Sequence, residues 1–207
     1  MRKLIYLLVT TGVAELVLFM LAIGSGLPLP IFAVQLLWLN LVTNGIQDVA
    51  LAFEKGEPGV LRRRPRPPRQ PIFDRRMIEQ VALTGAWMGI AAFASFWYLL
   101  DSGMRETEAR NLVLLLMVLF ENVHAFNARS ERRSIFRIPF AANPLLVLAV
   151  IGAQAIHIGA MYTPGLSHVL ELNPIDFRSW IEVAVVALSL LAVSELYKWL
   201  RPLHDDA

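Results

Sequence analysis

Five polar side chains recur at helical spacing inside one apolar stretch of the chain. They fall at positions i, i+3, i+4, i+7 and i+8, which share one face of an α-helix: Asn40, Thr43, Asn44, Gln47 and Asp48. Their carboxylate, amide and hydroxyl oxygens are the ligands that hard cations prefer. Gly45 lies beside this stripe, where it allows the helix to loosen and release backbone carbonyls as further ligands. The pattern therefore predicts contact with a cation.

Two more carboxylates lie deep in apolar stretches, Glu15 in one and Glu121 in another. A charge at the centre of a bilayer costs at least ~2.5–3.5 kcal/mol, so such a carboxylate normally faces a bundle interior. We expect both to reach the same cavity as the stripe. The alternatives are that the stripe only forms hydrogen bonds between helices, that Glu15 pairs with a neighbouring amide, or that Glu121 pairs with His124 or stays protonated.

Other polar residues within the apolar stretches indicate structure and not transport. Glu195 and Lys198 are three residues apart near the end of a stretch, where a structural ion pair is expected. His157 and Gln154 are likewise expected to form a packing pair and not a ligand set.

Small residues at four-residue or similar spacing predict close contacts between helices. Gly85 and Gly89 have this spacing in one apolar stretch, and Gly152, Ala155 and Gly159 have it in another. Both sets are expected to mark helix interfaces.

The composition of the chain indicates which secondary-structure elements position these residues. The chain has 207 residues, of which 56% are hydrophobic and 17% charged, and it has no cysteine. A soluble domain has about a quarter charged residues. The apolar residues form blocks near 20 residues long, which match the ~30 Å hydrocarbon core. The pattern excludes a soluble enzyme, a disulfide-rich secreted domain and a disordered chain. It predicts an all-α membrane protein, a bundle of six transmembrane helices at about 4–24, 31–53, 78–100, 110–128, 144–162 and 180–200.

These spans divide the chain into a helical hairpin at 1–53, a basic proline-rich loop at 54–77 and a four-helix region at 78–207. With six spans, 16 of the 19 Lys and Arg residues lie on the side of both termini. An excess of Lys and Arg marks the cytoplasmic side. We therefore expect cytoplasmic termini in a multi-pass protein of the cell membrane. Topology explains the basic residues, so the net charge of +2 gives no reason to expect nucleic acid.

The polar stripe also resembles a known family. Residues 35–45 read Gln-Leu-Leu-Trp-Leu-Asn-Leu-Val-Thr-Asn-Gly, which resembles the sixth membrane helix of P-type cation-transporting ATPases, the superfamily of calcium and sodium/potassium pumps. Residues 10–15 resemble the fifth helix and residues 121–127 the eighth. The resemblance covers nearly the whole chain, as helices five to ten of a calcium-pump-like protein. It implies that Glu15, Asn40, Thr43 and Glu121 are ion ligands.

Departures from the calcium-pump pattern leave the cation open. Those pumps have asparagine where this chain has Gly12, aspartate where it has Asn44, and Gly-Leu-Pro where it has Gly45-Ile46-Gln47. Asp48, one turn beyond Asn44, is a candidate to restore the lost carboxylate. Calcium, manganese, sodium, potassium and the proton all remain open.

The resemblance also implies parts that this chain lacks. The sequence contains neither the Asp-Lys-Thr-Gly-Thr phosphorylation motif nor Thr-Gly-Glu or Pro-Glu-Gly-Leu. We therefore expect a fragment, split-gene product or excised domain that has no cofactor and does not hydrolyse ATP by itself. The partners implied are the transported cation, the bilayer, the N-terminal membrane helices and the cytoplasmic catalytic domains, with ATP and Mg in the intact pump. The alternatives are a non-catalytic six-span scaffold or regulatory subunit, or an unrelated secondary transporter.

Overall fold

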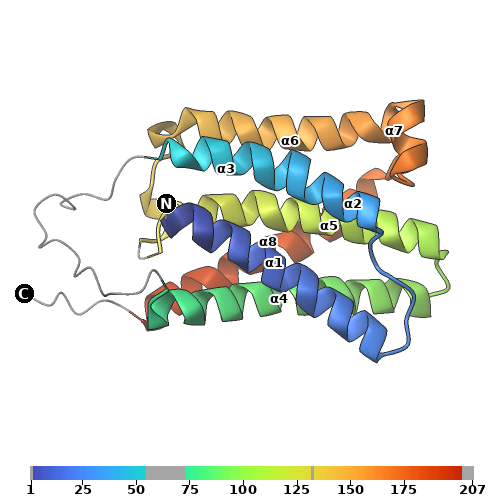
Figure 1. Ribbon diagram of the computed structural model, residues 1–207, viewed down its shortest axis with the longest axis horizontal. Coiled ribbons are helices and arrows are strands. Elements are labelled where there is room, and N and C mark those ends of the chain that lie inside the picture. Colours follow the sequence, from blue (N-terminus) through green and yellow to red (C-terminus); the bar gives the residue numbers. More distant parts are fainter. Residues whose placement is uncertain (1, 55–72, 132, 202–207) are drawn as a thin grey trace, which may run out of the picture.

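Long helices lie side by side along the molecule (Figure 1). The computed structural model describes residues 2–54, 73–131 and 133–201, and every regular element within these ranges is helical. Five of the helices are long and apolar enough to cross a membrane: α1 (Arg2–Gly24), α4 (Arg75–Asp101), α5 (Glu106–Asn127), α6 (Pro144–Tyr162) and α8 (Phe177–Leu200). These helices confirm an all-α membrane protein and correspond to five of the six predicted spans.

The remaining predicted span, 31–53, is not one regular helix. It consists of α2 (Ala33–Trp38), a π-helix η1 (Leu39–Asn44) and α3 (Gly45–Ala52), which follow one another without a gap. The Gly45 amide donates to the Asn40 carbonyl, five residues earlier. A π-helical turn is wider than an α-helical turn and is often found at functional sites. Residues 39–44 therefore depart from the 3.6-residue period on which the predicted stripe rests, directly before Gly45, where the sequence predicts that the helix can loosen.

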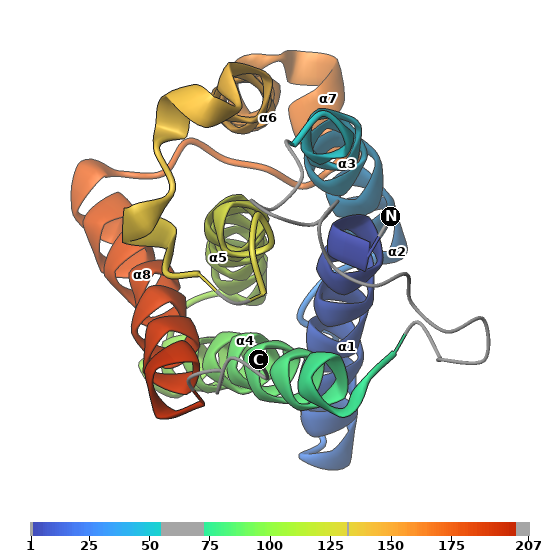
Figure 2. The same cartoon turned by 90° about the vertical axis from the view of Figure 1, so that its left-hand side faces the viewer.

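Helix α5 occupies the centre of the bundle. Its neighbours surround it when the molecule is viewed along the helices (Figure 2). In its most apolar stretch 83% of the residues are buried, compared with 17–33% for the other four long helices. Polar residues on a membrane helix are costly in lipid, and α5 avoids that cost because its neighbours cover it.

Glycines bring α1 and α4 into close contact. A Cβ atom added to Gly89 would lie 2.6 Å from the Ala14 carbonyl oxygen, and one added to Gly85 would lie 2.8 Å from Val13 Cγ1. The predicted interface role is confirmed for these two glycines. It is wrong for Gly152 and Gly159, because within the described residues nothing lies within 4 Å of a Cβ atom at either position.

The position of α6 explains why a Cβ atom at either glycine would meet open space. This helix lies at the edge of the bundle (Figure 2) and buries only one side, which includes Leu146, Ala153 and His157. Gly159 is on the exposed side. Spacing alone does not distinguish the two sides.

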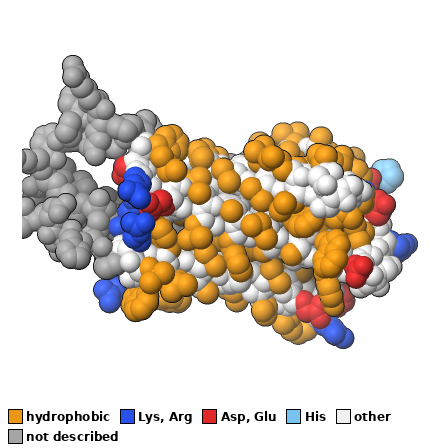
Figure 3. Space-filling view, turned by 90° about the horizontal axis from the view of Figure 1, so that it is seen from below, with side chains coloured by type: hydrophobic (Ala, Val, Ile, Leu, Met, Phe, Trp, Pro, Cys, Tyr) orange, Lys and Arg blue, Asp and Glu red, His pale blue; other side chains and the backbone are white. Residues whose placement is uncertain are grey.

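Charged side chains gather at the two ends of the molecule, and hydrophobic side chains cover the face between them (Figure 3). The start of α1 and the end of α8 lie at the same end (Figure 1). The predicted ion pair there is confirmed, with Lys198 Nζ 3.3 Å from Glu195 Oε1. In the described part of the chain, the connections also contain the short helices η3 (Ile135–Arg137), η4 (Phe140–Ala142) and α7 (Pro164–Val169).

Only the edges of the predicted basic loop 54–77 can be compared with the structure, because residues 55–72 lie outside the described residues. Helix α4 begins at Arg75, before the predicted end of the loop. Asp74 caps it by accepting a hydrogen bond from the Met77 amide at 2.9 Å.

Candidate cation-binding site

Asn44, the last residue of the π-helix, is at the centre of a polar cluster between helices. Its Nδ2 lies 3.1 Å from Glu121 Oε1 of α5, 3.4 Å from Thr11 Oγ1 of α1 and 3.4 Å from Asn40 Oδ1. Asn44 and Glu121 are both buried. One amide group therefore links α1, η1 and α5.

Asn40 extends this cluster to Glu15, another of the predicted ion-site residues. Its Nδ2 donates to Glu15 Oε1 at 3.2 Å and to the Leu36 carbonyl at 3.0 Å. Asn40 is exposed and Glu15 is half-buried. A hydrogen-bonded path thus runs from the buried Glu121, through Asn44 and Asn40, to Glu15 at the edge of the bundle.

The other two predicted residues lie outside that hydrogen-bonded path. Thr43 is buried, Asp48 is half-buried, and Thr43 Oγ1 and Asp48 Oδ1 have no hydrogen-bond partner among the described residues. The Thr43 hydroxyl and Asp48 Oδ1 are therefore not linked to this path in the described part of the chain.

The cluster has unused oxygens. Besides Thr43 Oγ1 and Asp48 Oδ1, Glu121 Oε2 and Asn44 Oδ1 are buried without a hydrogen-bond partner in the described part of the chain. Buried polar atoms are normally paired, and carboxylate, amide and hydroxyl oxygens bind hard cations. Within residues 2–54, 73–131 and 133–201, no group of three or more His, Cys, Asp and Glu is arranged to hold a metal ion. A cation here would therefore need amide and hydroxyl oxygens besides the carboxylates.

Glu121 does not pair with His124 in the described structure, contrary to that alternative. Glu121 accepts its hydrogen bond from Asn44. The His124 ring packs edge-on against Tyr6, with 5.0 Å between the ring centroids and 62° between the planes.

Gln47, a member of the predicted stripe, belongs to a second network. Its Nε2 donates to Asn122 Oδ1 at 2.7 Å, and Asn122 Nδ2 donates to Gln154 Oε1 at 2.8 Å. The expected packing partners His157 and Gln154 hydrogen-bond to different residues: His157 Nδ1 accepts from Trp38 Nε1 at 3.2 Å. For Gln47, the alternative of hydrogen bonds between helices describes the contacts that are present.

Thr11 is a member of the cluster that sequence reasoning did not select. The available signal was its position four residues before Glu15, which places both on one face of α1. Its hydroxyl also lies 3.0 Å from the Leu8 carbonyl oxygen and 3.3 Å from that of Leu7.

A cavity of about 150 Å³ lies elsewhere, between α4, α5 and α8. Its walls are mostly apolar and include Leu112, Leu116, Val183 and Val186. None of the six predicted ion-site residues lines it.

These features together define a polytopic helical membrane protein with a polar centre at an interrupted helix. Residues 28–200 match the family described as "Cation transporting ATPase, C-terminus". The chain belongs to this family, which confirms the predicted resemblance.

Relatives cover nearly all of the chain. It is 31% identical over 193 residues to the "Probable cation-transporting ATPase F" of Mycobacterium tuberculosis strain H37Rv, covering 93% of this chain and 21% of the relative. It is 31% identical over 199 residues to the "Calcium-transporting ATPase" of Bacillus subtilis, covering 94% and 22%. It is 26% identical over 229 residues to the "Endoplasmic reticulum calcium ATPase srcA" of Aspergillus fumigatus, covering 96% and 24%. The chain thus spans about a fifth to a quarter of the length of these relatives.

Proposed function

We propose that this C-terminal membrane domain supplies part of the intramembrane cation-binding site of an ATP-driven cation pump. The ligands from this chain are Glu15, Asn40, Thr43, Asn44, Asp48 and Glu121. The observation that carries the proposal is the contact between Asn44 and Glu121 at the π-helix, where both side chains also have an unused buried oxygen. Membership of a cation-transporting ATPase family supports it.

The contacts indicate how cation binding would move the helices. The Asn44 amide donates to Glu121 Oε1 in this structure, so a cation bound by both oxygens of this carboxylate competes with that hydrogen bond. Since Asn44 ends the π-helix and Gly45 begins α3, a change at Asn44 acts on the joint between the two segments. We infer that occupancy of the site is coupled to the position of α3 relative to α5.

We further propose a six-span topology with both termini in the cytoplasm. The consecutive segments α2, η1 and α3 cover residues 33–52, and a helical run of that length matches the hydrocarbon core at 1.5 Å per residue. The start of α1 and the end of α8 lie at the same end of the bundle (Figure 1). With these six spans, most Lys and Arg residues fall on that side.

The partners of the chain follow from its place in such a pump. The relatives are named as ATPases, and we assign ATP and Mg²⁺ to the parts of the intact pump that this chain does not include. The proposed partners are those catalytic domains, the N-terminal membrane helices, the lipid bilayer and the transported cation. The donor set is made of oxygens and suits several hard cations.

The test uses the full-length protein that carries this chain. Its ATPase activity is measured against a panel of divalent and monovalent cations, first for the wild type and then for Glu121→Gln and Asp48→Asn. Each variant removes one charge and keeps the side-chain volume. We expect each to raise the half-saturating concentration of the activating cation at least tenfold, a loss of about 1.4 kcal/mol in binding.

Glu182→Gln is the matched control for this test. Glu182 pairs with Arg178 on the surface of α8, and its side chain is 61% exposed. We expect this variant to behave as the wild type. If Glu121→Gln and Asp48→Asn both retain the wild-type cation dependence, the assignment of the site is wrong.

A further inference from the structure

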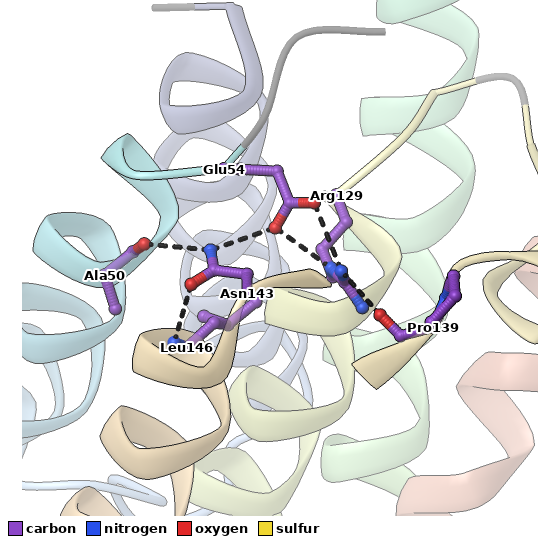
Figure 4. Close-up of polar contacts among 6 residues, drawn as sticks. All are labelled: Ala50, Glu54, Arg129, Pro139, Asn143 and Leu146. Atoms are coloured by element: carbon purple, nitrogen blue, oxygen red, sulfur yellow. Dashed lines mark hydrogen bonds and ion pairs between the residues drawn. The ribbon is translucent and has the colours of Figure 1, made fainter. Parts of the chain in front are cut away.

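A buried ion pair joins the end of α3 to the end of α5 (Figure 4). Arg129 Nε and Nη2 lie 3.0 and 3.2 Å from the two carboxylate oxygens of Glu54. The exposed fractions of these side chains are 1% for Arg129 and 5% for Glu54. Arg129 Nη2 also donates to the Pro139 carbonyl at 3.0 Å. The geometry is bidentate and shielded from water, which makes the pair strongly directional.

Asn143 adds a third helix to this ion pair. Its Nδ2 donates to Glu54 Oε2 at 2.9 Å and to the Ala50 carbonyl at 3.1 Å, near the end of α3. Its Oδ1 accepts from the Leu146 amide at 3.1 Å and so caps α6. One cluster therefore fixes the end of α3, the end of α5 and the start of α6 (Figure 4).

The cluster is also the last of three polar links between the segment that runs from η1 to Glu54 and the segment that runs from α5 to Arg129. Asn44 contacts Glu121, Gln47 contacts Asn122, and Glu54 contacts Arg129. From the first pair to the third, the residue numbers rise in both segments. The two segments therefore run in the same direction. A shift along the helix axis that breaks the outer link also displaces the two inner ones.

Helix α3 is suited to transmit such a shift. Its eight residues, Gly45–Ala52, span roughly 12 Å of regular α-helix between Asn44 and the cluster. The π-helix lies immediately before it. Movement at Glu54 would therefore be carried along α3 to Asn44, where the regular helix ends.

Stability alone does not account well for this cluster. A buried ion pair is often no more stabilising than apolar residues of similar volume. Moreover, Arg129 Nη1 is buried and has no hydrogen-bond partner among the described residues, and an unpaired buried donor lowers stability.

We propose that Arg129 is a positioning residue for the cation site. Through Glu54 and Asn143 it fixes the end of α3 beside the end of α5 and the start of α6, and thereby the distance between Asn44 and Glu121. This inference rests on the proposed function, because it assigns a remote determinant of affinity to the same site.

The experiment measures cation-stimulated ATPase activity of the full-length protein with Arg129→Met, Arg129→Lys and Glu54→Gln. Arg129→Met is expected to raise the half-saturating cation concentration about tenfold, with less than a twofold change in the maximal rate. Arg129→Lys keeps the charge but loses the bidentate geometry, so it should recover part of the affinity. Glu54→Gln, which keeps the side-chain volume, should weaken affinity about threefold and provides the test if Arg129→Met does not fold.

Two comparisons make the result decisive. Arg178→Met removes an ion pair on the surface of α8 whose arginine is 89% exposed, and it should leave the cation dependence unchanged. Glu121→Gln is measured in parallel. If Glu121→Gln weakens cation affinity but the folded variants of Arg129 and Glu54 do not, the positioning role is wrong and the site stands. If Glu121→Gln and Asp48→Asn also have no effect, the proposed function and this inference both fail.

Discussion

Asn44 shows how much one side chain can contribute to a buried polar site. An amide has both donors and an acceptor, and here the donor side faces Glu121, Asn40 and Thr11. This arrangement holds a carboxylate without an ion pair. The acceptor Oδ1 stays unused among the described residues, so Asn44 can both stabilise the site and supply an oxygen to a cation.

Replacing this amide by a carboxylate tests that dual role. Asn44→Asp removes the donor to Glu121 and places a second carboxylate beside it. Because the number of ligand charges sets the affinity for divalent ions, we expect the ratio of half-saturating Na⁺ to Ca²⁺ concentrations to rise at least tenfold. Cation-dependent ATPase activity of the full-length protein measures this ratio.

Asn44→Gln is the control for this substitution, since it keeps the amide chemistry and adds no charge. The ratio should then stay within about threefold of the wild type, even if affinity falls for both ions. An unchanged ratio in Asn44→Asp would show that Asn44 does not contact the ion.

Helix packing explains why small residues are needed at some positions and not at others. Gly85 and Gly89 allow the backbones of α1 and α4 to approach closely, and α1 carries both Glu15 and Thr11 of the site. The contact between α1 and α4 therefore helps to place one side of the polar cluster. On α6, Gly152 and Gly159 belong to a set of small residues with similar spacing, but a Cβ atom at either would meet open space.

A pair of alanine substitutions distinguishes these two situations. Gly89→Ala introduces a Cβ atom 2.6 Å from the Ala14 carbonyl oxygen, so the helices must move apart. Overpacking of this kind costs about 1–3 kcal/mol, and we expect a lower Tm in thermal unfolding of the detergent-purified full-length protein.

Gly152→Ala is the matched control on α6. It adds a methyl group where nothing lies within 4 Å in the described structure, and alanine has the higher helix propensity. Its Tm should equal or slightly exceed that of the wild type. Equal Tm values for Gly89→Ala and the wild type would show that the α1–α4 contact is not tight.

At the scale of the whole molecule, burial follows the distribution of polar groups. The central α5 contributes Glu121 and Asn122 to the two polar networks, and the surrounding helices cover it (Figure 2). Charged side chains lie at the two ends and an apolar surface lies between them (Figure 3). Charged ends with an apolar surface between them are what a membrane-spanning bundle requires, and this distribution leads to a testable orientation.

Cysteine labelling measures that orientation, since the chain has no cysteine of its own. Ser102, in the turn between α4 and α5, and Phe136, in the connection between α5 and α6, are both exposed. In intact cells, with any cysteines elsewhere in the full-length protein removed, Ser102→Cys should react with a membrane-impermeant maleimide. Phe136→Cys should react only after permeabilisation. The reverse pattern would contradict cytoplasmic termini.

The sequence by itself determined the membrane class, the approximate span boundaries, the family resemblance and the residues worth testing. These properties are local: a block of about 20 apolar residues matches a bilayer, and a polar residue inside the block is conspicuous wherever its neighbours lie. Glu15, Asn40, Asn44 and Glu121 could be selected in this way. The structure then joined them by hydrogen bonds between α1, η1 and α5.

Only the tertiary structure decided which polar groups meet. Periodicity assumes 3.6 residues per turn, and the π-helix at residues 39–44 departs from that value. Gln47, which follows the π-helix, pairs with Asn122 and not with the cluster around Asn44. Equal spacing likewise did not show that Gly89 faces α1 while Gly152 faces open space. Glu54 and Arg129, 75 residues apart, have no local signal at all. Their pairing depends on how α3 and α5 pack, and packing is a property of the whole bundle.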